Sequence, residues 1–192
     1  MDYKFYIGIL AGLIAFFAYI VYIRSILKGE TKPNKTTWWI WTFMGAVVGV
    51  SYYFSGAEAT MWVAVSEFIG PLVIALLSLK YGTGGVKDRT DLICLIGALI
   101  SIVLWIIFDS PVIALITNLI VDVFAVIPTI KHIRLNPDDE GIEGWFITWV
   151  ADCVNLFAID RLILGVIVYP VYMFIIDSIM VLVIRKSQKK VK

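Results

Sequence analysis

The chain has 192 residues, of which 60% are hydrophobic and 16% are charged, and its formal net charge is +1. A soluble domain is about 45–50% apolar and about 25% charged, so this composition excludes an ordinary soluble protein and indicates one in which the lipid bilayer is the solvent. The near-neutral charge gives no indication of nucleic-acid binding. We therefore expect residues 1–192 to form a single, all-α, integral membrane domain.

Seven apolar segments are long enough, or nearly long enough, to cross a bilayer as helices. The first follows Asp2 and Lys4 and has neither a basic leader nor a small-residue cleavage site, which predicts a retained helix rather than a signal peptide. A very short connection at Asp109 predicts that the fourth and fifth helices are antiparallel neighbours. The predicted transmembrane helices are residues 5–24, 37–54, 60–80, 91–108, 111–132, 144–159 and 162–185.

The lysine and arginine residues predict the orientation in the membrane. If the seven segments alternate in direction, 14 of these residues lie on one side, and only Lys4 and Arg161 lie on the other. Cytoplasmic loops retain positive charge during insertion, so we expect the amino terminus outside and the carboxyl terminus in the cytoplasm. The basic segment 185–192 is then an orientation anchor, and the location is a cell inner or plasma membrane.

An internal repeat relates the first three segments to the last three, with a shift of about 107 residues. Residues 22–24 align with 129–131 at helix ends, and residues 38–41 align with 146–149 at helix starts. An odd number of helices separates the copies, so both have the same orientation. We predict two parallel three-helix bundles that superpose, 5–80 and 111–185, joined by a linker helix at 91–108.

This arrangement, the outside amino terminus and the segment VIPTIK at residues 126–131 resemble the PQ-loop superfamily. That superfamily includes SWEET sugar transporters, lysosomal amino-acid exporters and KDEL receptors. Thr129 stands where the family has glutamine, and Val21 stands where the first repeat would have proline. The resemblance implies the seven-helix architecture and a function in moving or recognising a small solute.

Four acidic residues lie within the predicted helices: Glu67, Asp122, Asp152 and Asp177. A carboxylate at the centre of a membrane helix costs about 2.5–3.5 kcal/mol on insertion scales. No lysine, arginine or histidine lies deep in a predicted helix to neutralise these groups. Each must therefore be protonated, face water, or bind a cation or a hydrogen-bonding substrate.

Asp122 and Asp152 are predicted near the middle of the membrane. Asn118 lies one turn from Asp122 on the same helix face, and Asn155 lies one turn from Asp152. We expect Asp122 and Asp152 to face one another across the cavity of the second bundle. Two interpretations remain: these groups line a transport pathway, or they form a buried hydrogen-bond network that holds helices together.

Glycine, proline and tryptophan residues complete the set of candidates. Gly8 and Gly12 on the first helix, and Gly45 and Gly49 on the second, have the spacing that allows helix backbones to approach closely. Prolines inside helices can act as hinges or as fixed kinks. The candidate hinges are Pro71, Pro128 and Pro170.

The tryptophans fall into two groups. Trp41 and Trp149 are equivalent in the repeat and lie one turn inside their helices, where they can cap a cavity from the cytoplasmic side. Tryptophan near a helix end usually anchors the helix at the membrane interface. The predicted anchors are Trp38, Trp39, Trp62 and Trp145.

Together these features predict a small-solute transporter, coupled to protons or another cation, in which two bundles rock about a midplane site. The alternative is a receptor or binding protein on the same scaffold. The predicted coupling groups are Asp122, Asp152 and Asp177, and the predicted substrate-binding groups are Asn118, Asn155, Glu67, Trp41 and Trp149. The expected partners are the bilayer, a small-molecule substrate and, in a homo-oligomer, further copies of the chain.

The residue inventory argues against an enzyme and against a cofactor. Cys94 and Cys153 lie in apolar segments and are predicted to be free core residues. His132 is the only histidine in the sequence, and it lies among basic residues at a helix end. No nucleophile with a matching base, no zinc ligand set and no phosphate-binding loop can be assembled from this sequence.

Overall fold

The computed structural model describes residues 3–85, 89–108 and 110–189, and within these ranges the fold is all-α, with no strand. Most helices extend beyond the predicted apolar segments, because polar residues continue each helix past its hydrophobic part. The elements are α1 (Tyr3–Lys28), α2 (Lys35–Phe54), α3 (Met61–Tyr81), α4 (Arg89–Phe108), α5 (Pro111–Leu135), the short 3-10 helix η1 (Pro137–Asp139), α6 (Ile142–Leu156) and α7 (Leu164–Lys189).

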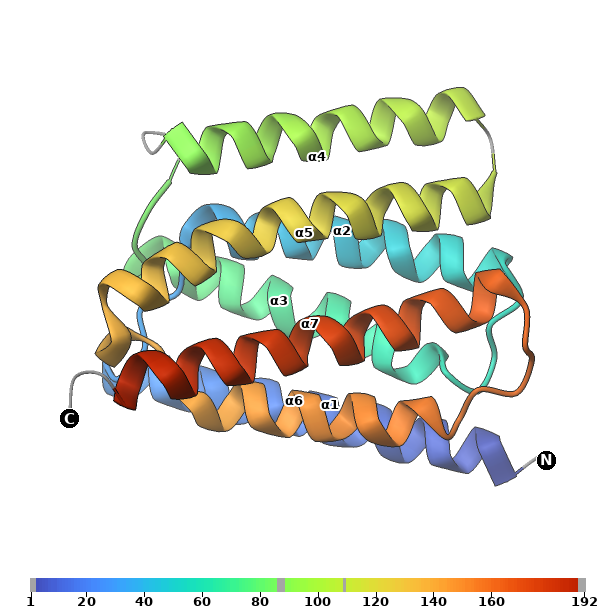
Figure 1. Ribbon diagram of the computed structural model, residues 1–192, viewed down its shortest axis with the longest axis horizontal. Helices are drawn as coiled ribbons and strands as arrows, with labels where there is room; N and C mark the ends of the chain where they lie inside the picture. The colour runs from blue at the N-terminus through green and yellow to red at the C-terminus, as the bar shows by residue number, and fades with distance from the viewer. Residues whose placement is uncertain (1–2, 86–88, 109, 190–192) are drawn as a thin grey trace.

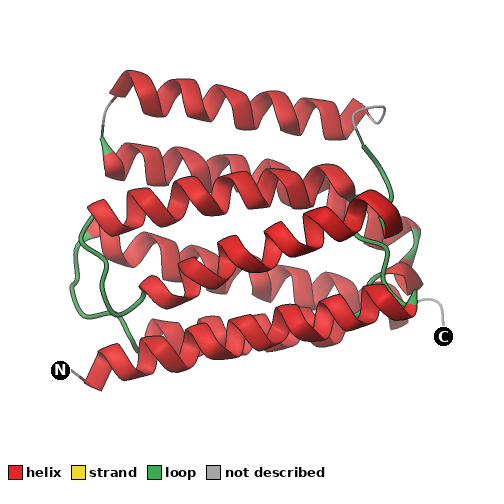
Figure 2. Ribbon diagram, turned by 180° about the vertical axis from the view of Figure 1, so that it is seen from behind, coloured by secondary structure: helices red, strands yellow, loops and turns green. Residues whose placement is uncertain are grey.

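The α-helices run side by side in one bundle, and consecutive helices point in opposite directions (Figure 1). α1 begins at one end of the bundle and α7 ends at the other. α4 lies at the edge of the bundle, against α5, and both views place it outside the other helices (Figures 1 and 2). The prediction that α4 and α5 are antiparallel neighbours is therefore confirmed.

Positive charge is concentrated at the end of the bundle where α1, α3, α5 and α7 end, which we call the basic end. Of the described lysines and arginines, only Lys4 and Arg161 belong to the opposite end. Lys87, Lys190 and Lys192 lie outside the described residues. Those at the basic end are Arg24, Lys28, Lys32, Lys35, Lys80, Arg89, Lys131, Arg134, Arg185, Lys186 and Lys189.

The outer surface of the bundle is apolar. α1, α3, α7 and residues 115–135 of α5 are each long and hydrophobic enough to cross a membrane. Large hydrophobic side chains point outward from these helices and from α4, among them Leu13, Phe17, Leu76 and Ile106. An apolar surface this extensive is typical of a protein that lies in lipid rather than in water.

Glycines allow the helices of the first half to pack closely. A Cβ atom added to Gly8 would overlap the backbone of Ala59, and one added to Gly12 would lie 2.7 Å from the Trp62 Cβ. A Cβ atom at Gly45 would lie 2.5 Å from the carbonyl oxygen of Glu67. The predicted close approach is confirmed at these positions, whereas Gly49 has ordinary space around it.

Hydrogen bonds between loops join the two halves at the basic end. The backbone amide of Lys32 donates to the carbonyl oxygen of Asp139 at 3.0 Å, and the Lys32 Nζ lies 2.7 Å from the Asp139 Oδ1. The same loop is held against the end of α3, because Thr83 donates its amide to the carbonyl oxygen of Pro33. At the opposite end, the Tyr52 hydroxyl donates to the carbonyl oxygen of Val166 at 2.8 Å.

Candidate functional site

A cavity lies between α1–α3 and α5–α7, and all six of these helices contribute to its wall. Together with its open mouth, it holds about 780 Å³ of space between atoms. The lining residues are Ala18, Tyr19, Tyr22, Trp38, Trp41, Met44, Gly45, Val48 and Glu67 from the first half, and Leu119, Asp122, Gly144, Trp145, Thr148, Tyr169, Tyr172, Met173, Ile176 and Asp177 from the second.

Two carboxylates in the wall are each held by a tyrosine from another helix. The Tyr19 hydroxyl of α1 donates to the Glu67 Oε2 of α3 at 2.6 Å. The Tyr172 hydroxyl of α7 donates to the Asp122 Oδ2 of α5, also at 2.6 Å. Gly70 makes the first pair possible, because any side chain at that position would overlap the ring of Tyr19. Each carboxylate is therefore oriented by one strong hydrogen bond.

A third carboxylate, that of Asp177 on α7, is 3% exposed and also lines the cavity. Among the described residues, its Oδ2 atom has no hydrogen-bond partner, and the same is true of the Glu67 Oε1. A buried acceptor without a partner is unfavourable unless a ligand, a proton or water satisfies it. Two of the acids that line the cavity, Glu67 and Asp177, thus each have one buried oxygen without a partner among the described residues.

No basic side chain is present among the described residues that line this cavity. The carboxylates of Glu67, Asp122 and Asp177 therefore have no counterion from the protein within the wall. Burying a negative charge in such surroundings is costly, so the site favours protons or a bound cation. The cavity is suited to neutral or positively charged contents and disfavours anions.

Four aromatic rings form a continuous layer between the carboxylates and the basic end. The ring centroids of Tyr22 and Trp38 are 5.1 Å apart, those of Trp38 and Trp41 4.9 Å, those of Trp41 and Trp145 5.8 Å, and those of Tyr22 and Trp145 6.5 Å. We call these residues the aromatic layer. They lie near the end of α1 and the starts of α2 and α6.

The aromatic layer corrects part of the tryptophan prediction. Trp38 and Trp145 are 5% and 8% exposed and line the cavity, so their predicted role as interface anchors is wrong. They point inward because α1 packs against α6, which brings Tyr22 between the two indoles. Trp39 and Trp62 are 40% and 41% exposed, as expected of anchors.

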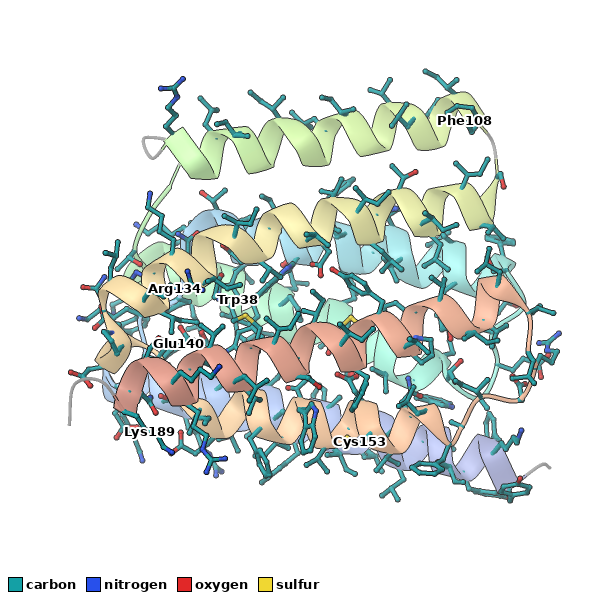
Figure 3. The ribbon with its side chains drawn as sticks, viewed as in Figure 1. Trp38, Phe108, Arg134, Glu140, Cys153 and Lys189 are labelled. Atoms are coloured by element: carbon teal, nitrogen blue, oxygen red, sulfur yellow. The ribbon has the colours of Figure 1, made fainter. Side chains whose placement is uncertain are left out.

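Glu140 supports this layer from the loop between η1 and α6. Its Oε1 atom accepts hydrogen bonds from the Tyr22 hydroxyl at 2.6 Å and from the Trp145 Nε1 at 2.8 Å. Burial raises the pKa of Glu140 to about 7, although these two hydrogen bonds oppose the shift. Figure 3 shows Glu140 and Trp38 in the part of the bundle that leads to the basic end.

The structure brings four of the predicted site residues to the cavity: Trp41, Glu67, Asp122 and Asp177. The other four, Asn118, Trp149, Asp152 and Asn155, are not among the described lining residues. Trp149 instead donates its Nε1 hydrogen to the Ser178 Oγ at 2.9 Å and packs on Phe174, so it joins α6 to α7.

The expected pairing of Asp122 with Asp152 is wrong. Asp152 is fully buried and is not among the described lining residues, and the acid that interacts with it most strongly is Asp177. The reason is the packing of the helices: α5 packs against α2, α4 and α7, whereas α6 packs against α1 and α7. α7 therefore separates the faces that carry Asp122 and Asp152. Asn155 is also fully buried, one turn from Asp152, where it belongs to the core.

Pro71 and Pro170 are buried inside α3 and α7, where hinge and fixed-kink interpretations both remain. The side chains of Pro128 and Cys94 lie outside the described residues. Cys153 is free, as predicted, but it is partly exposed, so its predicted place in the core is wrong. His132 lies at the basic end, 3.7 Å from Asp139, and the described residues contain no group of three potential metal ligands.

The tyrosines of the site and Glu140 are functional candidates that were not predicted from the sequence. Tyr19 lies three residues before Tyr22, and Tyr169 three before Tyr172, so each pair shares one helix face. That spacing is the signal that could have identified them.

A scan against protein-family models, a search of the curated proteins and a search of the solved structures each found no match.

Proposed function

We propose that this protein is a small-solute membrane transporter of the PQ-loop or SWEET type. The observation that carries the proposal is the position of the cavity, which is walled by three helices from each half of the chain and holds three carboxylates without a basic partner. Movement of one half against the other would expose such a site to either side of the membrane in turn.

The arrangement of the helices supports seven membrane crossings. Four helices meet the length and hydropathy of a membrane span on their own, and α2, α4 and α6 run alongside them in the same bundle (Figure 1). α6 has 15 residues and is therefore about 22 Å long. That length suits a helix buried between α1 and α7 rather than one facing lipid on all sides.

The packing of the helices also supports the parallel repeat. Within the first half, α3 packs against α1 and α2, and within the second half, α7 packs against α5 and α6. Between the halves, α1 packs against α6 and α2 packs against α5. Exchanging α1 with α5, α2 with α6 and α3 with α7 leaves this set of contacts unchanged. A twofold relation between the two halves requires such an exchange. In this arrangement α4 is the linker between the halves.

In this proposal the acidic groups have different tasks. Asp122 and Asp177 bind the coupling proton or a cationic group, and Asp152 exchanges a proton with its neighbour Asp177. Glu67 and Trp41 contact the substrate in the cavity. Asn118 and Asn155 are buried beside the wall, Trp149 joins α6 to α7, and Pro71, Pro128 and Pro170 are the candidate hinges.

Uptake by proteoliposomes tests the proposal. The purified protein is reconstituted, and entry of labelled sugars, amino acids and alkylammonium ions is measured with and without a pH gradient. We expect saturable uptake of at least one solute, which Asp122→Asn abolishes and Trp39→Leu, on the outer surface, leaves intact. Saturable binding without uptake would support the alternative, a receptor or binding protein on the same scaffold.

A further inference from the structure

We propose that the ligand of the cavity is an organic cation, whose alkylammonium group is held by the aromatic rings and neutralised by Asp177 and Glu67. This inference rests on the proposed function, since it takes the cavity as the substrate site. It adds the chemical class of the substrate, and it follows from the charges and rings of the wall.

The wall of the cavity carries acidic groups. Three carboxyl groups from α3, α5 and α7 face a cavity whose described lining has no basic side chain. The Asp177 Oδ2 and the Glu67 Oε1 are buried, and neither has a hydrogen-bond partner among the described residues. A cationic ligand compensates the charge of these carboxylates, whereas with a neutral ligand the carboxyl groups must hold protons instead.

The wall of the cavity also carries aromatic rings, which are independent of the acids. Three tryptophans and four tyrosines line the cavity. Trp38 and Trp41 meet at 89°, with their centroids 4.9 Å apart, and Trp41 meets Trp145 at 69°. These rings pack edge to face against one another, and all three tryptophans also line the cavity. A ring face that borders a cavity can hold an alkylammonium group through a cation–π interaction, for which tryptophan is the strongest partner.

Other ligand classes fit this wall less well. The described residues contain no set of three groups placed to bind a metal ion, which disfavours an inorganic divalent cation. A sugar requires many hydrogen-bond donors and acceptors. Apart from the acids, the tyrosine hydroxyls and the indole N–H groups, the described lining offers Thr148, whose hydroxyl donates to the carbonyl oxygen of Gly144. An anion would be repelled by the carboxylates.

Choline and its uncharged isostere 3,3-dimethylbutan-1-ol form a matched pair of probes, because they differ in charge and hardly in shape. Their binding to the purified protein can be followed by the fluorescence of the cavity tryptophans, with glucose as a neutral polyol. We expect choline to bind at least about tenfold more tightly than the isostere. Equal or weaker binding of choline, or no binding at millimolar concentrations, would overturn the inference.

Two variants locate the binding to this cavity. Trp41→Leu should weaken choline binding by about tenfold and change binding of the isostere little, because only the cation uses the face of the ring. Asp177→Asn replaces the acid by a side chain of nearly the same volume and should reduce the preference for choline over its uncharged isostere. Trp39→Leu is the control, since its side chain points outward. If both cavity variants preferred choline over its uncharged isostere as strongly as the wild type does, the inference would also be overturned.

Transport assays separate this inference from the proposed function. Uptake of choline into proteoliposomes supports both. Uptake of glucose or a zwitterionic amino acid, with no binding of choline, overturns the organic-cation inference and leaves the transporter intact. Tight choline binding with no uptake of any solute supports the ligand class and instead contradicts transport.

Discussion

The hydroxyl of Tyr22 on α1 donates a 2.6 Å hydrogen bond to Glu140, a loop residue 118 positions later in the chain. The same carboxylate oxygen accepts from Trp145 on α6. One buried acid therefore joins the first half of the bundle to the second and holds two rings of the aromatic layer. The backbone carbonyl of Glu140 also accepts from Gln188 of α7, so the loop is tied to three helices.

Replacing Glu140 by glutamine should change how stability depends on pH. Burial raises the pKa of Glu140 from 4.5 to about 7, and the charge of Asp139 adds to the shift. An acid with a raised pKa stabilises the folded state most below its unfolded pKa, and this contribution falls as pH rises from about 4.5 to about 7. The full loss is on the order of 3 kcal/mol for this shift.

Glu140→Gln keeps the acceptor oxygen for both donors but does not titrate. Its thermal midpoint in detergent, relative to that of the wild type, should therefore be higher at about pH 8 than at about pH 5. Glu140→Ala is the matched control, because it loses both hydrogen bonds and should be less stable than Glu140→Gln at each pH. A difference between Glu140→Gln and the wild type that does not change with pH would contradict the burial of this acid.

Gly70→Ala should disrupt the wall of the cavity. A Cβ atom at this position overlaps the ring of Tyr19, so the ring must move and its hydrogen bond to Glu67 must break. We expect a loss of about 1–3 kcal/mol of stability, typical of overpacking, together with weaker ligand binding. Thermal unfolding and tryptophan fluorescence of the purified variant measure both effects.

Gly49→Ala is the matched control for that substitution. It is also a glycine inside a helix, but a Cβ atom there meets only the Met61 Cε, at 4.0 Å. Alanine favours the helix over glycine by about 0.5–1 kcal/mol, so this variant should be as stable as the wild type or more stable. If both variants behaved alike, the close contact of Tyr19 with Gly70 would be refuted.

The positions of the helices could be predicted because apolar segments and polar junctions alternate clearly in this sequence. The ends could not be predicted as well, because α1, α5 and α7 continue through charged residues as far as Lys28, Leu135 and Lys189. α6 ends earlier than predicted, at Leu156, where Ala158 donates its amide to the carbonyl oxygen of Asn155 in a turn. The hydropathy of the sequence does not reveal such a turn, so it does not predict where the helix ends.

The cost of burying a carboxylate singled out four acids, of which Glu67, Asp122 and Asp177 line the cavity and Asp152 is not among its described lining residues. The aromatic part of the cavity could not be predicted, because tryptophan near a helix end is usually an anchor and depth alone does not reveal which face points inward. Trp38 and Trp145 are buried only because α1 packs against α6. Contacts between distant helices cannot be read from the spacing of residues in one sequence.

The charge at the two ends of the bundle predicts the orientation in the membrane. Nearly all the described lysines and arginines lie at the basic end, so we expect that end, with the carboxyl terminus, in the cytoplasm. A reporter that is active only in the cytoplasm should work when fused to the carboxyl terminus and fail at the amino terminus. Reversed activities, or activity at both ends, would show that the number of crossings is even or that the orientation is wrong.

A disulfide across the basic end should stop transport if the two halves must separate there. The backbone hydrogen bond from Lys32 to Asp139 places these two residues side by side, as a designed disulfide requires. Lys32→Cys with Asp139→Cys, in a protein whose Cys94 and Cys153 are replaced by alanine, should lose uptake on oxidation and regain it on reduction. The single-cysteine variants should not respond to the oxidant. Full uptake by protein that is demonstrably cross-linked would mean that the basic end does not open at this loop, and that solute leaves the cavity by another path.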